Sequence, residues 1–452
     1  MKRKTFVSVL ALFSCLFTGL NVIVAQNPFV TDQFTADPTA RVFEGKMYVY
    51  PSHDIPTPAA KPGIKDWFCM EDYHVFSSED LSEWTDHGVI VNQKQVPWVD
   101  GNSYSMWAPE CVEKNGKYYF YFPANVKRDS TTRGGFGVGV GVSEKPYGPF
   151  RFEPKAIKGV GGIDPCVLID KDGQSYIYWV ARGLSVAKLK DNMMELASEP
   201  QVLEGLPEGF KEGPFTFERN GKYYLTFPHV KNKTEELAYC ISDNPMGPFK
   251  YGGVIMDESP VGCWTNHHSI VEYKGQWYLF YHHNDLSPKF DKNRSIRADS
   301  LFFNADGSIQ KVIPTLRGVG FTPATNKIQI DRYSGKSNEG ATVDFIDTTN
   351  TFAGWKTVFD KKGSWIRYNA VDFPKSLKTV SARVRSSFGI ILQIRLDKVD
   401  GSIVAKIVVS KSDNWQDIKC KVKKIKPGKH DLFVTSDVDG KVEVDWVRFK
   451  FR

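Results

Sequence analysis

The sequence predicts an all-β fold, with a five-bladed β-propeller over residues 27–325 and a jelly-roll-like β-sandwich over residues 341–452. Three observations lead to this prediction. One hairpin phrase recurs five times, no stretch shows a sustained apolar period of 3.6 residues, and the last part of the chain changes to short alternating strands. A chain of 452 residues has room for two such domains.

The recurring phrase is a turn that ends in Gly, followed by a polar residue and an aromatic-rich strand. Glycine suits a tight hairpin because it adopts positive φ at little cost. The glycines of the phrase are Gly45, Gly116, Gly173, Gly221 and Gly275. Their spacings of 71, 57, 48 and 54 residues each accommodate a four-stranded blade with variable loops.

Residues 1–25 are typical of a signal peptide, because Lys2–Lys4 precede an apolar run that ends at Ala25, a suitable cleavage point. A membrane anchor is the alternative, since about 20 apolar residues can span a bilayer, but Ser8 and other polar residues interrupt the run. Cys15 leaves open a lipid-anchored surface form. The sequence therefore predicts a secreted or periplasmic protein without a membrane span.

The net charge of +7 and a charged fraction of 25% are those of an ordinary soluble globular protein. The basic stretch at residues 421–429 is better explained as an edge strand and turn than as a nucleic-acid site. Six cysteines after the leader lack metal-like spacing, so we expect mostly small buried apolar residues, with disulfides left open. They are Cys69, Cys111, Cys166, Cys240, Cys263 and Cys420.

The strand before each hairpin phrase begins with residues that can be compared between blades. The innermost strands of a propeller line its axis, so one end of each strand converges on a shared pocket. Three of the five positions carry a carboxylate, Asp37, Asp164 and Glu212, and a fourth carries His267 and His268. A single Asp-Pro is usually a turn initiator, but three like charges at equivalent positions are costly unless a site uses them.

Five phrases give the sequence a resemblance to glycoside hydrolase family 43, a group of five-bladed propeller glycosidases, over residues 27–325. They are ADPTARVFEGKMYVYPSHD, MWAPECVEKNGKYYFY, GGIDPCVLIDKDG, FKEGPFTFERNGKYYLTF and NHHSIVEYKGQWYLFYHH. The resemblance implies that Asp37 is the general base that activates water and Glu212 the general acid. It implies that Asp164 raises the pKa of Glu212 and orients it. It also implies inversion, for which the working carboxyls lie roughly 6.5–9.5 Å apart.

The same resemblance implies further pocket residues and no required cofactor. Trp107 would form an apolar wall beside the cleaved bond, or would be a core residue. Arg294 would bind sugar hydroxyls and restrain Glu212, although Arg297 is close enough to be the alternative. His268 lies where some members hold a hydrated structural calcium ion, and an axial histidine without metal is the alternative.

Residues 324–340 are polar and linker-like, and the strands after them resemble carbohydrate-binding module family 6. In that family an aromatic residue in a loop-end cleft stacks on sugar, which points to Trp415 and, more weakly, to Trp355. The loops are short, and the Asn frequently found near the last strand is missing around residues 444–446. A domain that only supports the propeller is therefore an equal alternative.

These residues predict an exo-acting β-xylosidase or α-L-arabinofuranosidase on plant cell-wall glycans, with an oligo- or polysaccharide as its partner. An endo-acting arabinanase or xylanase is the first alternative. A non-catalytic glycan-binding propeller is the second, although a lectin has no use for the acid trio. Retaining fructosidase propellers would need Asn-Asp-Pro and Arg-Asp-Pro, where this chain has Ala36 and Ile163. The oligomeric state is left open.

Overall fold

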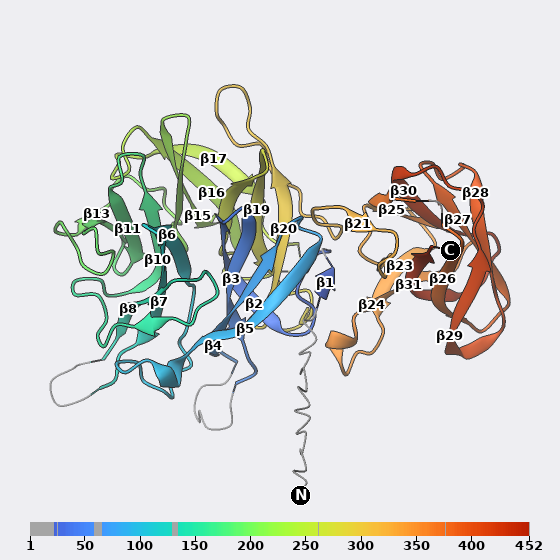
Figure 1. Ribbon diagram of the computed structural model, residues 1–452, viewed down its shortest axis with the longest axis horizontal. Helices are drawn as coiled ribbons and strands as arrows, with labels where there is room; N and C mark the ends of the chain where they lie inside the picture. The colour runs from blue at the N-terminus through green and yellow to red at the C-terminus, as the bar shows by residue number, and fades with distance from the viewer. Residues whose placement is uncertain are drawn as a thin grey trace, which may run out of the picture.

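A computed structural model describes residues 22–24, 26–57, 66–128, 134–260, 262–375 and 377–451. Figure 1 shows a large β-domain followed by a smaller one at the C-terminal end of the chain. Helix in the described residues is limited to two 3₁₀ turns, η1 (Gln93–Gln95) and η2 (Thr351–Ala353). Among these residues, no helix has the length and apolar character needed to cross a membrane. The all-β prediction is confirmed.

Five antiparallel sheets form the large domain, one for each predicted blade. Blade one contains β1 (Val22–Val24), β2 (Phe34–Phe43), β3 (Lys46–Asp54), β4 (Met70–Ser78) and β5 (Glu83–Asn92). Blade two contains β6 (Glu110–Lys114), β7 (Lys117–Asn125), β8 (Phe136–Ser143) and β9 (Arg151–Phe152). Blade three contains β10 (Ile163–Ile169), β11 (Ser175–Val180), β12 (Leu184–Leu189) and β13 (Gln201–Val202). Blade four contains β14 (Phe215–Arg219), β15 (Lys222–Val230), β16 (Glu235–Ser242) and β17 (Lys250–Met256). Blade five contains β18 (Ser269–Tyr273), β19 (Gln276–His283) and β20 (Ser295–Leu301).

The recurring phrase is the hairpin between the first two strands of each blade. In four blades both central turn residues have positive φ, as in Glu44-Gly45 at 52° and 74° and Asn115-Gly116 at 56° and 74°. This is the type I′ geometry that matches the twist of the flanking strands. Gly173 lies instead in a longer turn, where its N–H donates to the Asp170 carbonyl. The repeat therefore predicted both the number and the order of the blades.

The innermost strands β2, β6, β10, β14 and β18 contact one another in order, and β18 contacts β2 to complete the ring. The segment before β2 strengthens this closure. The side chain of Asn27 exchanges two hydrogen bonds with the backbone of Ala298 in β20, and the N–H of Phe29 donates to the Ile296 carbonyl. Blade five, which has three strands of its own, is thus tied to the start of blade one.

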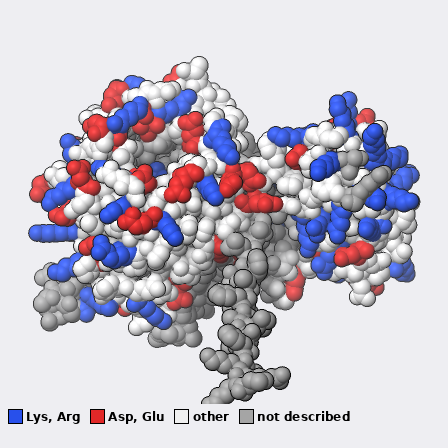
Figure 2. Space-filling view, in the orientation of Figure 1, with Lys and Arg blue, Asp and Glu red and all other residues white. Residues whose placement is uncertain are grey.

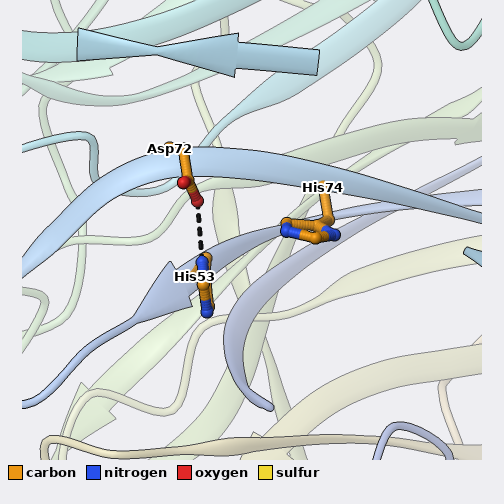
Figure 3. A group of neighbouring side chains, drawn as sticks. All are labelled: His53, Asp72 and His74. Carbon is orange, nitrogen blue, oxygen red and sulfur yellow. Dashed lines mark hydrogen bonds and ion pairs between the residues drawn. The ribbon is translucent and has the colours of Figure 1, made fainter. Parts of the chain in front are cut away.

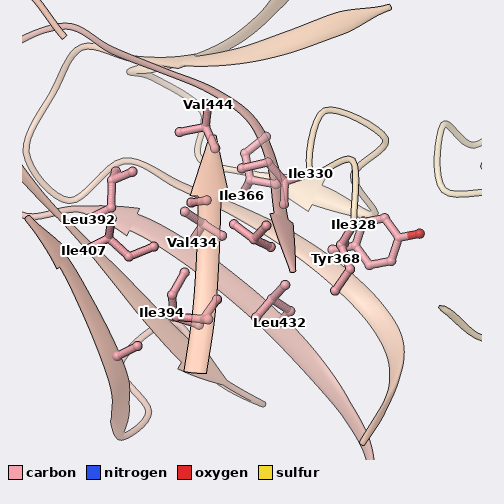
Figure 4. Close-up of a cluster of buried hydrophobic side chains, with 14 of the residues drawn as sticks. Ile328, Ile330, Ile366, Tyr368, Leu392, Ile394, Ile407, Leu432, Val434 and Val444 are labelled. Carbon is pink, nitrogen blue, oxygen red and sulfur yellow. The ribbon is translucent and has the colours of Figure 1, made fainter. Parts of the chain in front are cut away.

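The second domain is a sandwich of two sheets. One contains β21 (Thr322–Pro323), β22 (Gly335–Lys336), β25 (Trp365–Phe373), β27 (Ile390–Leu396), β28 (Ile403–Val409) and β30 (Gly428–Ser436). The other contains β23 (Ala341–Phe345), β24 (Trp355–Phe359), β26 (Thr379–Ser386), β29 (Ser412–Lys421) and β31 (Val442–Lys450). Apolar residues of alternate positions in both sheets fill the space between them, as Figure 4 shows for Leu392 and Ile394 of one sheet and Val444 of the other.

The sandwich begins earlier than the sequence predicted. We expected residues 324–340 to be a linker, but Ala324, Ile328 and Ile330 are fully buried in the sandwich core. Figure 4 shows the two isoleucines among the core side chains. Strand β21 pairs in parallel with β25, which brings this segment onto the sheet. A few well-spaced apolar residues among polar ones are enough to anchor residues 324–340 in the sandwich core.

The two domains pack against each other through the N-terminal segment. The Gln26 amide donates to the Gln329 carbonyl at 3.0 Å and to the Tyr368 hydroxyl at 2.8 Å. The Arg332 guanidinium donates to the Asn27 carbonyl, and the rings of Phe34 and Phe352 lie 4.8 Å apart. Of the range predicted to be a signal peptide, β1 is described and pairs with β5, whereas residues 1–21 and 25 lie outside the described residues.

The positive charge of the chain resides in the sandwich. Residues 334–451 carry 22 Lys and Arg against 14 Asp and Glu, and Figure 2 shows Lys and Arg spread over the visible face of this domain. Of the basic stretch at 421–429, only Lys421 belongs to an edge strand, β29, and the stretch ends in β30, a central strand, so the edge-strand prediction holds for its first residue alone. The six cysteines are unpaired and five of them are buried, in agreement with their interpretation as apolar residues.

Candidate active site

A cavity of about 350 Å³ lies where the starts of the innermost strands meet. It holds the three carboxylates that the sequence singled out, Asp37, Asp164 and Glu212, together with side chains from every blade. The other lining residues are Trp67, Phe68, Met70, Trp107, Ala108, Ile163, Lys211, Val230, Glu235, Trp264, Thr265, His267 and Arg294. The predicted convergence of the blades on one pocket is therefore found in the structure.

Two of the carboxylates stand on strained backbone. Asp37 has φ of 48° and Asp164 has φ of 57°, a left-handed conformation that is uncommon outside glycine. Each lies where the pairing register of its strand shifts, between Ala36 and Thr39 in β2 and between Ile163 and Cys166 in β10. Such irregularities redirect a side chain, and they concentrate at functional sites.

Blade four uses the same backbone bend with a different residue. Gly213 takes the left-handed conformation there, with φ of 65°, and its N–H donates to the Asp164 carboxylate at 2.8 Å. Glu212 precedes the bend, so its longer side chain enters the pocket from one position earlier in the strand. A Cβ on Gly213 would lie 2.8 Å from the ring of Pro228, so the bend requires glycine.

Asp37 is almost fully buried and strongly bound. The guanidinium of Arg294 donates to both of its oxygens, at 2.7 and 3.1 Å, and the Ser52 hydroxyl donates at 2.6 Å. Its backbone N–H donates to Nδ1 of His282 at 3.0 Å. Burial alone would raise the pKa of Asp37, but the charge of Arg294 and these other neighbours lower it below its ordinary value. Asp37 is therefore ionised at neutral pH.

The guanidinium of Arg294 makes five side-chain hydrogen bonds, all to acceptors within the protein. Besides the two bonds to Asp37, it donates to both oxygens of Asp54, each at 3.0 Å, and to the Thr265 hydroxyl at 3.1 Å. The sequence expectation was that it would bind sugar hydroxyls and restrain Glu212. Instead it forms a buried carboxylate–guanidinium–carboxylate group that fixes Asp37. Arg297, the alternative, pairs with Asp285 and does not line the pocket.

Glu212 and Asp164 have raised pKa values. The pKa of Glu212 is raised to about 7, first by burial and then by the charge of Asp37. The pKa of Asp164 is raised well above its usual range, first by burial and then by Glu212. The sequence expectation assigned the rise at Glu212 to Asp164, whereas the structure gives burial as the larger cause. The pocket thus combines the ionised Asp37 with Glu212, whose pKa lies near neutral pH, and with Asp164, whose pKa is also raised.

Glu235 is a further pocket carboxyl that the sequence analysis missed. It begins β16, is 1% exposed, and accepts a hydrogen bond from the N–H of Asn266 at 2.7 Å. Burial and then the neighbouring Glu212 raise its pKa to about 8. It belongs to no recurring phrase, so only the fold reveals it.

Aromatic side chains form one side of the pocket. Trp107 lies there as the sequence predicted, with its ring 6.5 Å from Phe68 and 4.7 Å from Phe136. Trp67, Phe68 and Trp264 also line the cavity and were not predicted. Aromatic faces of this kind stack on the apolar faces of sugar rings.

The axial histidines are neutral. Burial lowers the pKa of His267, which lines the pocket, to about 4, and lowers that of the fully buried His268 well below its usual range. Nε2 of His268 lies 2.7 Å from the Thr226 hydroxyl, while its Nδ1 is buried without a hydrogen-bond partner among the described residues. Unlike His267, His268 does not line the pocket, contrary to the expectation that it is a pocket residue.

The two aromatic candidates of the sandwich lie in different surroundings. Trp415 lies within the edge strand β29, and Arg383 and Arg385 lie over its ring at 5.4 and 4.8 Å. The ring of Trp355 stacks on Phe345 at 5.3 Å and has the Arg332 guanidinium over it at 3.5 Å. Trp415 stands on an edge strand and is covered by arginines, not in the expected loop-end cleft. Trp355, in contrast, lines a cavity of about 420 Å³ together with Gln26, Asp331 and Phe352, at the junction of the two domains.

The fold and the pocket define a class of enzyme. An ionised carboxylate and a carboxyl protonated near neutral pH face an aromatic-walled cavity, which is the equipment for acid–base cleavage of glycosidic bonds. Residues 25–309 match the family described as "Glycosyl hydrolases family 43", and residues 334–451 match "Carbohydrate binding module (family 6)". The chain belongs to glycosyl hydrolase family 43 and is a glycosidase with an appended module of the second family.

Known proteins agree with this assignment. The chain is 39% identical over 331 residues to "Xylosidase/arabinosidase 43A" of Humicola insolens, covering 62% of this chain and 98% of that protein. It is 38% identical to the structure of CoXyl43, a β-xylosidase/α-arabinofuranosidase from a compost metagenome in complex with xylotriose, described as calcium-free. That match has a TM-score of 0.57 and covers 64% of this chain and 98% of the other.

A second structure shares both domains. The arabinoxylan arabinofuranohydrolase of Bacillus subtilis matches 95% of this chain and 99% of its own, with a TM-score of 0.57 and 24% identity. At this identity the likeness establishes the two-domain fold alone.

Proposed function

We propose that the pocket removes terminal β-xylosyl or α-L-arabinofuranosyl units from plant cell-wall glycans, with inversion. The observation that carries the proposal is the split in pKa between Asp37, which is ionised, and Glu212, raised to about 7. The relatives named above support these two sugars. The small cavity favours the end of a glycan chain over a long internal segment, which supports exo over endo action.

In this mechanism each carboxyl has one task. Asp37 takes a proton from water as the water attacks the anomeric carbon. Glu212 gives its proton to the glycosidic oxygen as the bond to the leaving group breaks. Asp164, bound by the N–H of Gly213, holds the bend from which Glu212 projects, and Arg294 holds Asp37 in place. The aromatic wall around Trp107 excludes water from the sugar face.

The test is hydrolysis of aryl β-xyloside and aryl α-L-arabinofuranoside by the purified protein. Glu212→Gln should lower kcat/KM for whichever substrate is cleaved by about 100- to 10,000-fold, the contribution of a general acid. Glu204→Gln, an exposed glutamate of the loop before blade four, serves as the control and should keep wild-type activity. Proton NMR of the first-formed sugar should give the inverted anomer. A retained anomer would reject the roles of Asp37 and Glu212.

We also propose that His268 holds a hydrated structural calcium ion on the propeller axis. Its unpartnered Nδ1 and the neutral imidazole support this, and the bond from Nε2 to Thr226 fixes the ring. Calcium prefers oxygen ligands, so water would supply most of them. When bound, the ion would offset the negative charge of the pocket carboxylates. Calcium should raise the melting temperature of the wild type and not that of His268→Phe; an equal rise in both would reject the site.

For localisation, we propose export with removal of residues 1–25, which takes the edge strand β1 from blade one and leaves its other four strands. The charged start and apolar run support it. N-terminal sequencing of the exported protein should begin at Gln26, and a chain that still begins at Met1 after export would contradict the proposal.

A further inference from the structure

A second group of functional side chains lies outside the pocket, on the pair of strands β3 and β4 of blade one. Ser52 pairs with Tyr73 in the antiparallel ladder, so His53 lies beside Asp72. Side chains two apart on a strand share a face, which puts His74 on the same side as Asp72. Figure 3 shows the three residues together, with one ring nitrogen of His74 on the side of the His53–Asp72 pair.

Each histidine is oriented by a carboxylate. Nδ1 of His53 lies 2.7 Å from Asp72, and Nδ1 of His74 lies 3.1 Å from both oxygens of Asp86. Asp86 is itself held by the Gly88 N–H at 2.7 Å. A carboxylate on one ring nitrogen fixes the tautomer and strengthens the other nitrogen as a metal ligand, the usual arrangement around metal-bound histidines. His74 is therefore prepared to bind an ion through Nε2.

We propose that His53, Asp72 and His74 bind a divalent transition-metal ion of the zinc type. One ligand atom from each of the three lies within 4.8 Å of the others. Ligand atoms around a tetrahedral zinc ion lie roughly 3.4 Å apart, so small side-chain rotations close the site. Two imidazoles and one carboxylate suit zinc and its neighbours, whereas calcium and magnesium prefer oxygen ligands alone.

The exposure of the group supports exchange of an ion with solvent. The side chains of His53, Asp72 and His74 are 21%, 11% and 14% exposed, so they are ordered by neighbours yet open on one side. Three protein ligands leave a fourth position for water. This site is separate from the axial His268, which is fully buried, and it stands independently of the catalytic proposal.

The test uses the untagged full-length protein, stripped with chelator and titrated with zinc chloride in a calorimeter. The wild type should bind one equivalent, and zinc should raise its melting temperature. His74→Gln should weaken binding at least tenfold, and the double variant His53→Gln/His74→Gln should lose it. His430→Gln is the matched control, because His430 also pairs with a carboxylate, Asp397, at 2.9 Å; it should bind zinc as the wild type does.

Two outcomes would overturn the proposal. One is wild-type binding in the double variant, which would put the ion elsewhere. The other is absence of binding in the wild type at millimolar zinc. Retained hydrolysis of the aryl glycosides by the double variant shows that it is folded, because neither histidine lines the pocket. Anomalous diffraction at the zinc edge should place the ion between His53, Asp72 and His74.

Discussion

The carboxyls of the pocket determine how activity depends on pH. Glu212 acts as an acid and must be protonated, so kcat/KM should fall as pH rises through about 7. Asp37 acts as a base and must be ionised; its pKa is lowered, mainly by the charge of Arg294 against the effect of burial, so activity should fall only at a pH below the ordinary range of an aspartate carboxyl. A pH profile of kcat/KM checks both limbs. A basic limb that persists unchanged in Glu212→Gln would assign it to another group.

By stabilising ionised Asp37, Arg294 determines the pH at which kcat/KM falls on the acidic side of the profile. Arg294→Lys keeps the charge but loses the planar fork that holds Asp37 and Asp54 together, so kcat/KM should fall about 100-fold or more. The acidic limb should also move to higher pH, because a lysine cannot donate to both oxygens of Asp37 as the guanidinium does, so the ionised carboxylate is stabilised less. Arg297→Lys is the control: it alters a second, slightly less buried ion pair, with Asp285, and should leave the acidic limb in place.

Among the individual residues of the pocket, the sequence predicted those that belong to the repeat. Asp37 and Asp164 occupy equivalent strand starts, Glu212 lies one position before the equivalent Gly213, and the repeat brings all three into the pocket. Glu235 and Trp264 come from loops and hairpins of variable length, whose direction depends on how the blades close. The pairing of Arg294 with Asp54 was equally invisible, since 240 residues separate the partners.

At the scale of the strand, the bend at Gly213 should be the most sensitive backbone position in the pocket. Gly213→Ala places a Cβ 2.8 Å from the Pro228 ring at a φ of 65°, and it should lower both the melting temperature and kcat. Gly221→Ala has a similar φ of 77° but nothing within 4 Å, so it isolates the backbone strain. Thermal unfolding and kinetics of both variants make the comparison. Equal activity in Gly213→Ala and Gly221→Ala would contradict the claim that a Cβ at residue 213 collides with Pro228.

The repeat predicted the blades because each hairpin is a local unit with its own turn chemistry. The start of the sandwich was mispredicted for the opposite reason. Ile328 and Ile330 are isolated apolar residues in a polar segment, and their burial comes from β25 and β31, which follow later in the chain. Local pattern cannot reveal a partner that is distant in sequence.

For the whole molecule, the junction should couple the stability of the two domains. A chain that ends at residue 320 loses the acceptors of the Gln26 amide and the contact of Phe34 with Phe352. These two hydrogen bonds, one buried and one partly buried, at about 1 kcal/mol each correspond to a drop in melting temperature of roughly 5 °C. Calorimetry should give one transition for the full chain and an earlier one for the shortened chain. An unchanged melting temperature would mean that the propeller is stable alone.

The left-handed backbone at Asp37 and Asp164 also constrains how this enzyme can change during evolution. Asparagine and glycine tolerate that conformation with little strain, whereas most other residues pay for it in stability. A descendant that gave up hydrolysis and kept the fold would therefore pass most easily through Asn or Gly at these two positions. Such a pair in a related genome would mark a propeller that has become a receptor for the sugars its ancestor cut.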